Sequence, residues 1–208
     1  MKAIANILVE HNIVRTNFTD PFLWASGIHS PIYCDCRELM SLTNARNEIV
    51  DGFIELIERE NLATEFVAGT ATAGIPWAAF VAERLSKPML YVRGKPKDHG
   101  AGKMVEGRGE QDKKILVVED AISTGGSSIV SANALRKELN ATVEHILGIF
   151  TWSTPKVAEN EREHNITFHT LTDFSEIVEA LKAAEKISNE EEASLNKFHD
   201  NPREWWQG

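Results

Sequence analysis

Cysteine is nearly absent from this chain of 208 residues, which contains only Cys34 and Cys36. Two thiols are too few for a zinc site unless other side chains complete it. A disulfide between them is also unfavourable, because side chains at this spacing in a strand are too far apart to bond without strain. We therefore expect two reduced, half-buried thiols, as is usual in a cytoplasmic protein.

Long apolar runs are missing as well. The longest, such as residues 75–82, are far too short to span a bilayer. The N-terminal segment has one basic residue, Lys2, and Glu10 follows before a sufficient apolar stretch or a cleavage site, so no secretory signal is expected. The sequence thus predicts a cytoplasmic protein with no membrane partner.

Basic residues are outnumbered, since 22 Lys and Arg face 31 Asp and Glu and give a net charge of −9. A protein that binds nucleic acid through its whole surface normally carries the opposite sign, so we expect no nucleic-acid partner. The net charge does not exclude a polyanionic ligand, but it requires that the basic site for this ligand be local. The length suits one large domain with at most a small appendage.

The chain does contain a regular alternation of strand-like and helix-like segments. Strands are expected at 31–36, 65–68, 89–93, 114–119, 143–151 and 166–171, and helices at 2–12, 43–61, 73–85, 126–139, 155–163 and 173–185, with Thr43 as an N-cap. This alternation predicts an α/β fold, a doubly wound, mostly parallel sheet flanked by helices. Ligands in such folds bind at the carboxyl ends of the strands.

One segment, I-L-V-V-E-D-A-I-S-T-G-G-S-S at residues 115–128, carries the strongest chemical signal. An apolar strand ends in Glu119 and Asp120, and a turn with Gly125 and Gly126 then opens a helix. Glycines allow close approach of the backbone, and free N–H groups at a helix start bind anions. Carboxylates accept hydrogen bonds from sugar hydroxyls. A diol next to a phosphate is what ribose 5-phosphate presents.

A cationic segment interrupts this acidic chain at residues 93–109, which include five glycines. Its basic side chains are Arg93, Lys95, Lys97, His99, Lys103 and Arg108. We expect a mobile loop without regular structure that closes over a pyrophosphate and neutralises its charge as it departs. A histidine near neutral pH can donate a proton or a hydrogen bond there.

Four segments together resemble those of a known family, the type I phosphoribosyltransferases. Residues 115–128 resemble its signature for phosphoribosyl pyrophosphate (PRPP), and V-A-G-T-A-T-A-G-I-P at 67–76 resembles its pyrophosphate loop. K-D-H-G at 97–100 is similar to the catalytic loop of the orotate phosphoribosyltransferases. S-G-I-H-S-P at 26–31, followed by Tyr33, is similar to their loop over orotate. The resemblance extends from about residue 18 to residue 171.

The resemblance implies transfer of ribose 5-phosphate from PRPP to orotate, giving orotidine 5'-monophosphate and pyrophosphate in the biosynthesis of pyrimidine nucleotides. It implies Mg²⁺ as cofactor, carried by PRPP and not by protein ligands. It also implies a homodimer in which the basic loop reaches the neighbour's active site. We expect a single domain over 1–208, with residues 1–40 forming a hood over the base and residues 186–208 a C-terminal helical tail.

The implied catalytic residues are Lys97, His99 and Asp120, and the implied orotate contacts are Ser26, Tyr33 and Thr124. The implied PRPP-binding set consists of Arg93, Lys97, His99, Glu119, Asp120, Ala121, Ile122, Ser123, Thr124, Gly125, Gly126 and Ser127. The sequence departs from the family pattern at two places. Gly94 follows Arg93, so Lys95 is displaced by one position, and Ala25 stands where some members have a base-binding lysine.

Two alternatives remain open on the sequence. A purine phosphoribosyltransferase would share the fold. Several purine-specific members of the family carry an Asp at the position of Ser123, where it can accept a proton from the purine ring. A serine is a much weaker base, so the resemblance favours a pyrimidine substrate. A PRPP-sensing regulator that binds nucleic acid would need a helix-turn-helix extension or a basic face, and the sequence shows neither.

Overall fold

The structure is a computed structural model that describes residues 3–24, 27–96 and 102–206. It divides into two compact units. The larger unit comprises residues 42–171, and the smaller one combines residues 1–41 with residues 172–208. The expected hood and the expected tail therefore belong to the same unit.

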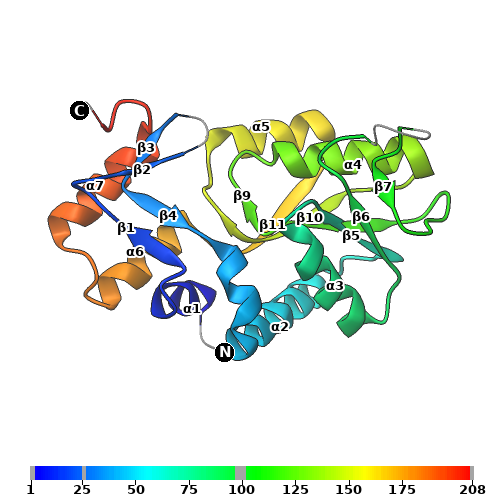
Figure 1. Ribbon diagram of the computed structural model, residues 1–208, viewed down its shortest axis with the longest axis horizontal. Coiled ribbons are helices and arrows are strands. Elements are labelled where there is room, and N and C mark those ends of the chain that lie inside the picture. Colours follow the sequence, from blue (N-terminus) through cyan, green and yellow to red (C-terminus); the bar gives the residue numbers. More distant parts are fainter. Residues whose placement is uncertain (1–2, 25–26, 97–101, 207–208) are drawn as a thin grey trace. The chain divides into compact units, whose positions relative to one another are not determined.

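A single sheet forms the centre of the larger unit (Figure 1). Its strands are β5 (Phe66–Thr70), β6 (Met89–Val92), β7 (Val105–Glu106), β8 (Ile115–Val118), β9 (Ala121–Ile122), β10 (His145–Thr151) and β11 (Thr167–Asp173). The strand order is β11-β10-β8-β5-β6-β7, with β9 paired to β10. Pairs among β5, β6, β8, β9 and β10 are parallel, whereas β7 is antiparallel to β6. The predicted α/β class with a mostly parallel sheet is confirmed.

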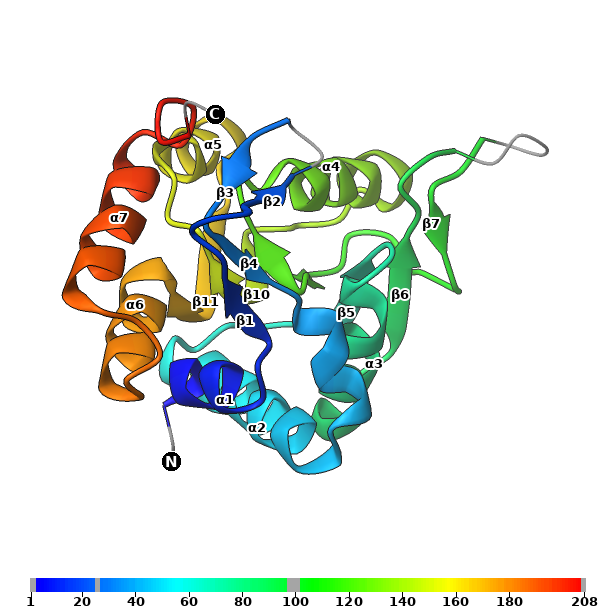
Figure 2. The same cartoon turned by 60° about the vertical axis from the view of Figure 1, so that its left-hand side comes forward.

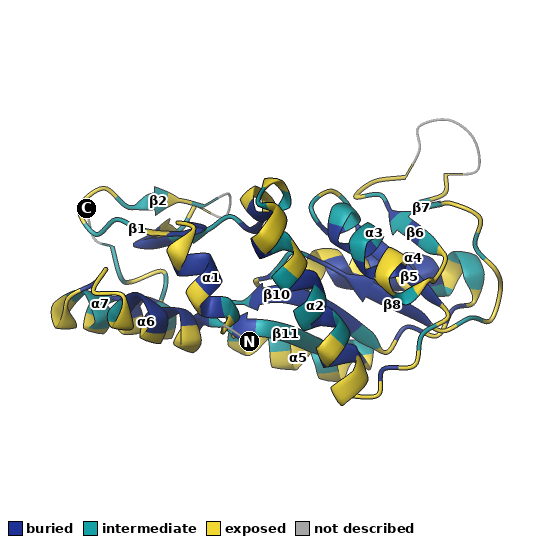
Figure 3. Cartoon of the chain, turned by 90° about the horizontal axis from the view of Figure 1, so that it is seen from below, coloured by how far each residue is buried: buried dark blue, intermediate teal, exposed yellow. Residues whose placement is uncertain are grey.

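Helices cover both faces of this sheet. They are α2 (Thr43–Arg59), α3 (Gly74–Leu85), α4 (Gly126–Leu139) and α5 (Pro155–His164). Helices α2 and α3 lie on one face and α4 and α5 on the other (Figures 1 and 2). Every residue of β5 and β8 is buried, because helices cover both faces of these central strands (Figure 3). This burial explains the continuous apolar runs in the sequence.

Two expectations about this unit were wrong. The N-cap of α2 is Leu42, and no side chain caps the helix, because Thr43 is already its first helical residue. The segment 93–109 was expected to lack regular structure, but Val105 and Glu106 pair with Val92 and Tyr91 as β7. Val105 is β-branched and the neighbouring Glu106 is charged, which suits a short edge strand.

The smaller unit consists of short elements from both ends of the chain. They are α1 (Ile4–Glu10), β1 (Val14–Thr16), β2 (Phe22–Leu23), β3 (His29–Ser30), β4 (Ile32–Cys34), the 3-10 helix η1 (Cys36–Ser41), α6 (Phe174–Ala183) and α7 (Asn189–Asp200). Strands β1 and β4 pair antiparallel, as do β2 and β3. Nζ of Lys186 donates to the carbonyl of Val9 at 2.6 Å and so ties the C-terminal part to α1.

The C-terminal tail packs through aromatic side chains. Its helix α7 starts with a capping box between Ser188 and Glu191. Beyond the helix, the indole N–H of Trp205 donates to Oγ of Ser194 at 2.9 Å, and its ring meets Phe198 edge-on at 5.9 Å. Within the described ranges, no helix is both long and apolar enough to cross a membrane.

The two cysteines are free, as expected. Cys34 is half-buried as expected, whereas Cys36 is buried, contrary to the expectation, and their Sγ atoms lie 3.7 Å apart.

Candidate active site

Strand β8 delivers Glu119 and Asp120 to the carboxyl edge of the sheet. The backbone beyond β8 is held by β10, because Glu119 donates its N–H to the carbonyl of Leu147 at 2.8 Å and the carbonyl of Asp120 accepts from Ile149 at 2.9 Å. Ala121 and Ile122 then form β9 beside the end of β10. The two carboxylates thus stand at the position where ligands bind in parallel α/β sheets.

The two acids have different environments. Glu119 is only 5% exposed, whereas Asp120 is half-exposed. The carboxylate of Glu119 accepts hydrogen bonds from the hydroxyls of Ser127 at 3.0 Å and Ser128 at 3.3 Å, and from the N–H of Asp120 at 3.2 Å. Burial, followed by the negative charge of Asp120, raises the pKa of Glu119 to about 8. Asp120 is therefore the acid that a ligand can reach, and Glu119 supports the turn from behind.

A tight turn joins this strand end to α4. Gly125 is the N-cap residue of α4 and has φ of 80°, a left-handed conformation that favours glycine. A Cβ at this position would also collide with the ring of Phe168, whose Cε1 atom would lie 2.9 Å away. Ser123, Thr124, Gly126 and Ser127 are exposed on the turn. The turn and the N–H groups at the start of α4, which no side chain caps, are of the kind that binds an anion.

A second strand-turn-helix unit lies beside the first. Strand β5 leads through Ala71 and Thr72, whose peptide bond is cis, into α3. A Cβ on Gly74, the first residue of α3, would lie 3.1 Å from Cα of Glu119, so only glycine allows this helix to approach the acidic strand end. The hydroxyl of Thr70 is buried and has no partner within the described chain. This turn corresponds to the expected pyrophosphate loop.

The base of the cationic segment is fixed by backbone and acidic contacts. Arg93 donates its N–H to the carbonyl of Met104 at 3.0 Å, and its Nη1 lies 3.6 Å from Oε1 of Glu106. Glu138 on α4 accepts the N–H groups of Met104 at 2.7 Å and Val105 at 3.3 Å. Lys97 and His99 lie outside the described residues, so their expected roles stay predictions.

The expected orotate contacts fall in the smaller unit and on the turn. Tyr33 lies on β4, where its ring is 5.6 Å from that of Phe22 and its hydroxyl accepts from Nη2 of Arg37 at 3.3 Å. Ser26 lies outside the described residues. Thr124 is exposed on the turn before α4.

Thr154, which precedes α5, and Asn160, which lies within it, contact the turn, and neither contact was expected from the sequence. The hydroxyl of Thr154 donates to the carbonyl of Ser123, and the side-chain amide of Asn160 donates to that of Thr124, both at 2.7 Å. Neither residue belongs to a recognisable motif. A polar residue at 160 on a helix that packs against a sheet was the one available signal.

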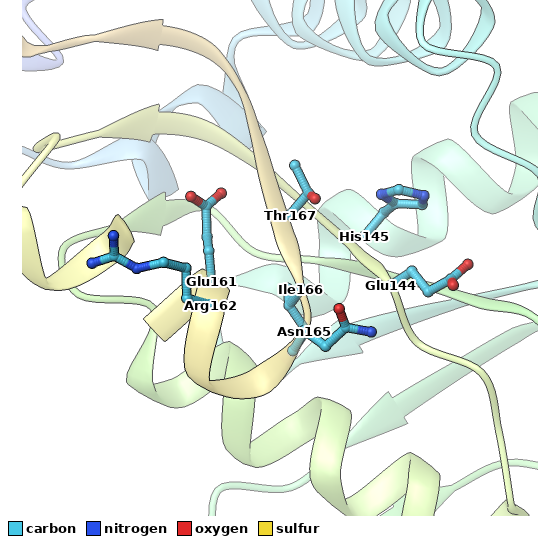
Figure 4. Close-up of a pocket in the computed structure, with 7 residues that line it drawn as sticks. All are labelled: Glu144, His145, Glu161, Arg162, Asn165, Ile166 and Thr167. Carbon is cyan, nitrogen blue, oxygen red and sulfur yellow. The ribbon is translucent and has the colours of Figure 1, made fainter. Parts of the chain in front are cut away.

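A pocket of about 450 Å³ lies elsewhere in the larger unit (Figure 4). It includes His145, the first residue of β10, whereas the turn before α4 lies beside the last residues of that strand. Its side chains of Glu144, Glu161, Arg162 and Asn165 point in different directions, so they do not converge on one ligand (Figure 4). Among the described residues, no group of three or more His, Cys, Asp or Glu side chains is suited to hold a metal ion.

Comparison with known proteins defines the class to which this fold and site belong. A sequence model described as "Phosphoribosyl transferase domain" matches residues 40–184, and the chain belongs to this family. The orotate phosphoribosyltransferase of Enterococcus faecalis is 43% identical over 98% of this chain and 97% of its own. That of Staphylococcus saprophyticus is 44% identical over 96% and 98%. These relatives place the chain among the orotate phosphoribosyltransferases.

A solved structure agrees with the sequence relatives. The crystal structure of orotate phosphoribosyltransferase from Aeropyrum pernix superposes with a TM-score of 0.74 at 27% identity, covering 89% of this chain and 99% of that one. The family suggested by the sequence motifs is therefore confirmed.

Proposed function

We propose that this chain catalyses the transfer of ribose 5-phosphate from PRPP to orotate, giving orotidine 5'-monophosphate and pyrophosphate. The observation that carries the proposal is the reachable carboxylate of Asp120 directly before an anion-binding turn, in a chain 43% identical to orotate phosphoribosyltransferases over nearly its full length. A carboxylate next to a phosphate site fits the hydroxyls and the 5'-phosphate of one ribose.

The proposed mechanism breaks the bond between ribose C1 and the pyrophosphate oxygen, which keeps the bonding electron pair, and forms a bond from C1 to a ring nitrogen of orotate that has already lost its proton and attacks as an anion. Positive charge develops on the ribose ring, and negative charge develops on the leaving group. Asp120 holds the ribose hydroxyls, and the turn from Ser123 to Ser127 holds the 5'-phosphate. Arg93, Lys97 and His99 neutralise the pyrophosphate, because positioned cations stabilise charge that appears in the transition state. A closed loop also excludes water, which would hydrolyse PRPP.

Mg²⁺ belongs to the proposal as a companion of PRPP. The donor set of the described site contains one reachable carboxylate, that of Asp120, next to hydroxyl groups. This set does not need to ligate the ion directly, because Mg²⁺ commonly keeps several waters and can take its remaining ligands from the phosphate oxygens of PRPP. When bound, the ion would supply positive charge to the leaving pyrophosphate.

We further propose that the protein acts as a homodimer in the cytoplasm and that each basic loop serves the neighbour's site. Ser26 and Tyr33 are proposed to contact orotate, together with Thr124. The proposal also keeps the chain as one functional domain with a hood at 1–40 and a helical tail at 186–208. These elements rest on the resemblance of the motifs to the family.

The decisive experiment follows the ultraviolet absorbance of orotate in the presence of the purified protein. The signal should fall only when PRPP and Mg²⁺ are both present. Hypoxanthine, xanthine and adenine serve as competing bases, and conversion of one of these instead of orotate would support the purine alternative. A gel shift of DNA or RNA that depends on PRPP, without any base conversion, would support the regulator.

A further inference from the structure

The turn before α4 is held from one side by the segment that ends β10 and begins α5. Three successive carbonyls, those of Ile122, Ser123 and Thr124, accept hydrogen bonds from this segment. The donors are the N–H of Trp152 at 3.0 Å, the hydroxyl of Thr154 at 2.7 Å and the side-chain amide of Asn160 at 2.7 Å. The backbone of the turn is therefore oriented by contacts from outside the turn itself.

These three hydrogen bonds determine the direction in which the N–H groups of the turn point. In a trans peptide the C=O and the following N–H point in opposite directions. The only cis peptide of the described residues joins Ala71 and Thr72, so the peptides of the turn are trans. Because three carbonyls face the β10–α5 segment, the N–H groups of Ser123, Thr124 and Gly125 face away from it. Successive N–H groups that point to one side form a nest for an anion.

Two features indicate that these contacts serve the turn and not α5 itself. Thr154 is the N-cap residue of α5, a position where a threonine hydroxyl ordinarily accepts an N–H of its own helix, yet its side chain makes no such capping bond and donates to Ser123 instead. Asn160 is the one buried residue of α5 and is only 7% exposed, although it is polar. A buried amide needs a partner, and the carbonyl of Thr124 is the acceptor for its N–H.

We infer that Thr154 and Asn160 are positioning residues that aim the N–H groups of the phosphate turn at the 5'-phosphate of the ribose. The inference rests on the proposed function and adds residues that none of the motifs contains. It assigns no contact with the substrate to either side chain, since both act through the carbonyls that they hold. It also predicts that substitution of either residue weakens the binding of ribose 5-phosphate more than the binding of pyrophosphate, because the pyrophosphate is assigned to other loops.

The test compares binding of ribose 5-phosphate with binding of pyrophosphate and Mg²⁺, each measured by calorimetry on the full-length protein. Asn160→Ala and Thr154→Val should each weaken ribose 5-phosphate binding by about tenfold, as expected for the loss of one orienting hydrogen bond. Binding of pyrophosphate should change less than about twofold. Glu159→Ala, an exposed change on the same helix, should leave both affinities unchanged.

Each outcome separates the inference from the function. If the wild-type protein binds ribose 5-phosphate and both variants bind it equally well, the positioning role is wrong while the proposed function stands. Equal weakening of both ligands in both variants would also overturn the inference, because a general loss of structure is not selective. Failure of the wild-type protein to bind ribose 5-phosphate at all would instead contradict the proposed function. Thr154→Val conserves shape at a half-exposed site and keeps the test usable if Asn160→Ala does not fold.

Discussion

The hydroxyl of Ser127 on α4 lies 3.0 Å from Oε2 of Glu119 and donates a hydrogen bond to it. This bond joins the first turn of the helix to the buried end of β8. It lowers the pKa of Glu119, but burial and the charge of Asp120 outweigh it, and the pKa is about 8. A buried acid that is protonated at neutral pH therefore lies directly behind the proposed ribose site.

The raised pKa of Glu119 predicts a pH-dependent stability. The folded state binds a proton that the unfolded state loses above its ordinary pKa of 4.5. The stabilisation is fully present below that value and is lost as pH rises towards and through 8. Glu119→Gln removes this titration. The melting temperature of the variant minus that of the wild type should therefore increase as pH rises from 5.5 to 9. Thermal melts across this range give the result, and a constant difference between the two proteins would disprove the assignment.

The reachable carboxylate of Asp120 predicts that removing its charge lowers catalytic efficiency with PRPP. Asp120→Asn keeps the shape of the side chain but removes the charge that accepts the ribose hydroxyls, so kcat/KM for PRPP should fall by about tenfold or more. Asp51→Asn serves as the control, because Asp51 pairs with Arg84 on the exposed surface of α2 and α3. A fully active Asp120→Asn variant would contradict the ribose assignment.

The roles proposed for Lys97 and His99 predict that binding and turnover separate. Lys97→Ala and His99→Ala should each lower kcat by about a hundredfold or more while the affinity for PRPP changes little, because charge on the leaving group develops mainly in the transition state. Steady-state kinetics combined with a direct PRPP binding measurement tests this. Lys87→Ala, a basic residue outside the loop, is the control. Parallel losses in kcat and in affinity would rule out the leaving-group role.

A loop shared between subunits predicts that two inactive variants repair each other. When Lys97→Ala and Asp120→Asn proteins are mixed and allowed to exchange subunits, half of the dimers become mixed, and each mixed dimer has one intact site. Activity should then recover to about a quarter of the wild-type value. Mixing two different loop variants, Lys97→Ala with His99→Ala, should restore no more than their separate activities if both residues serve the same neighbouring site. Absence of recovery in the first mixture would place the loop in its own subunit's site.

The close contact between Gly125 and the Phe168 ring predicts that Gly125→Ala destabilises the fold more than Gly27→Ala does. Gly125→Ala must adopt φ of 80° and meet the Phe168 ring, whereas Gly27 has nearly the same φ of 79° but no atom within 4 Å of an added Cβ. Both substitutions carry the backbone cost of about 1 kcal/mol, and only the first also carries a steric cost. Gly125→Ala should therefore lower the melting temperature clearly more than Gly27→Ala does. Equal shifts would show that the turn relaxes away from the ring.

Local pattern was sufficient to predict much of the larger unit. The limits of α4 are those expected from the sequence, because a glycine turn precedes it and Asn140, in a left-handed conformation, follows it. The buried strands β5 and β8 were expected from apolar runs. The short strands β7 and β9 were not, since a two-residue strand has no periodicity and exists only through its partner.

The residues of the site could be predicted from the sequence, but their different roles could not. The sequence presents Glu119 and Asp120 as equivalent neighbours, and only the packing of Gly74, Ser127 and Ser128 around Glu119 distinguishes them. Thr154 and Asn160 were missed because their contacts join positions about 30 or more residues apart. Such contacts depend on how β10 and α5 pack, which a motif does not encode.

Strand β7 forms one of the two edges of this sheet. An edge strand with many open N–H and C=O groups can add a strand from another molecule, which leads to aggregation. Here the edge is only two residues long, runs antiparallel to β6, contains the charged Glu106 and is followed by Gly107 with φ of 104°. A foreign strand would find too few aligned groups to pair with at this edge. The same short strand that anchors the cationic segment thereby protects this edge of the sheet against pairing with a strand of another molecule.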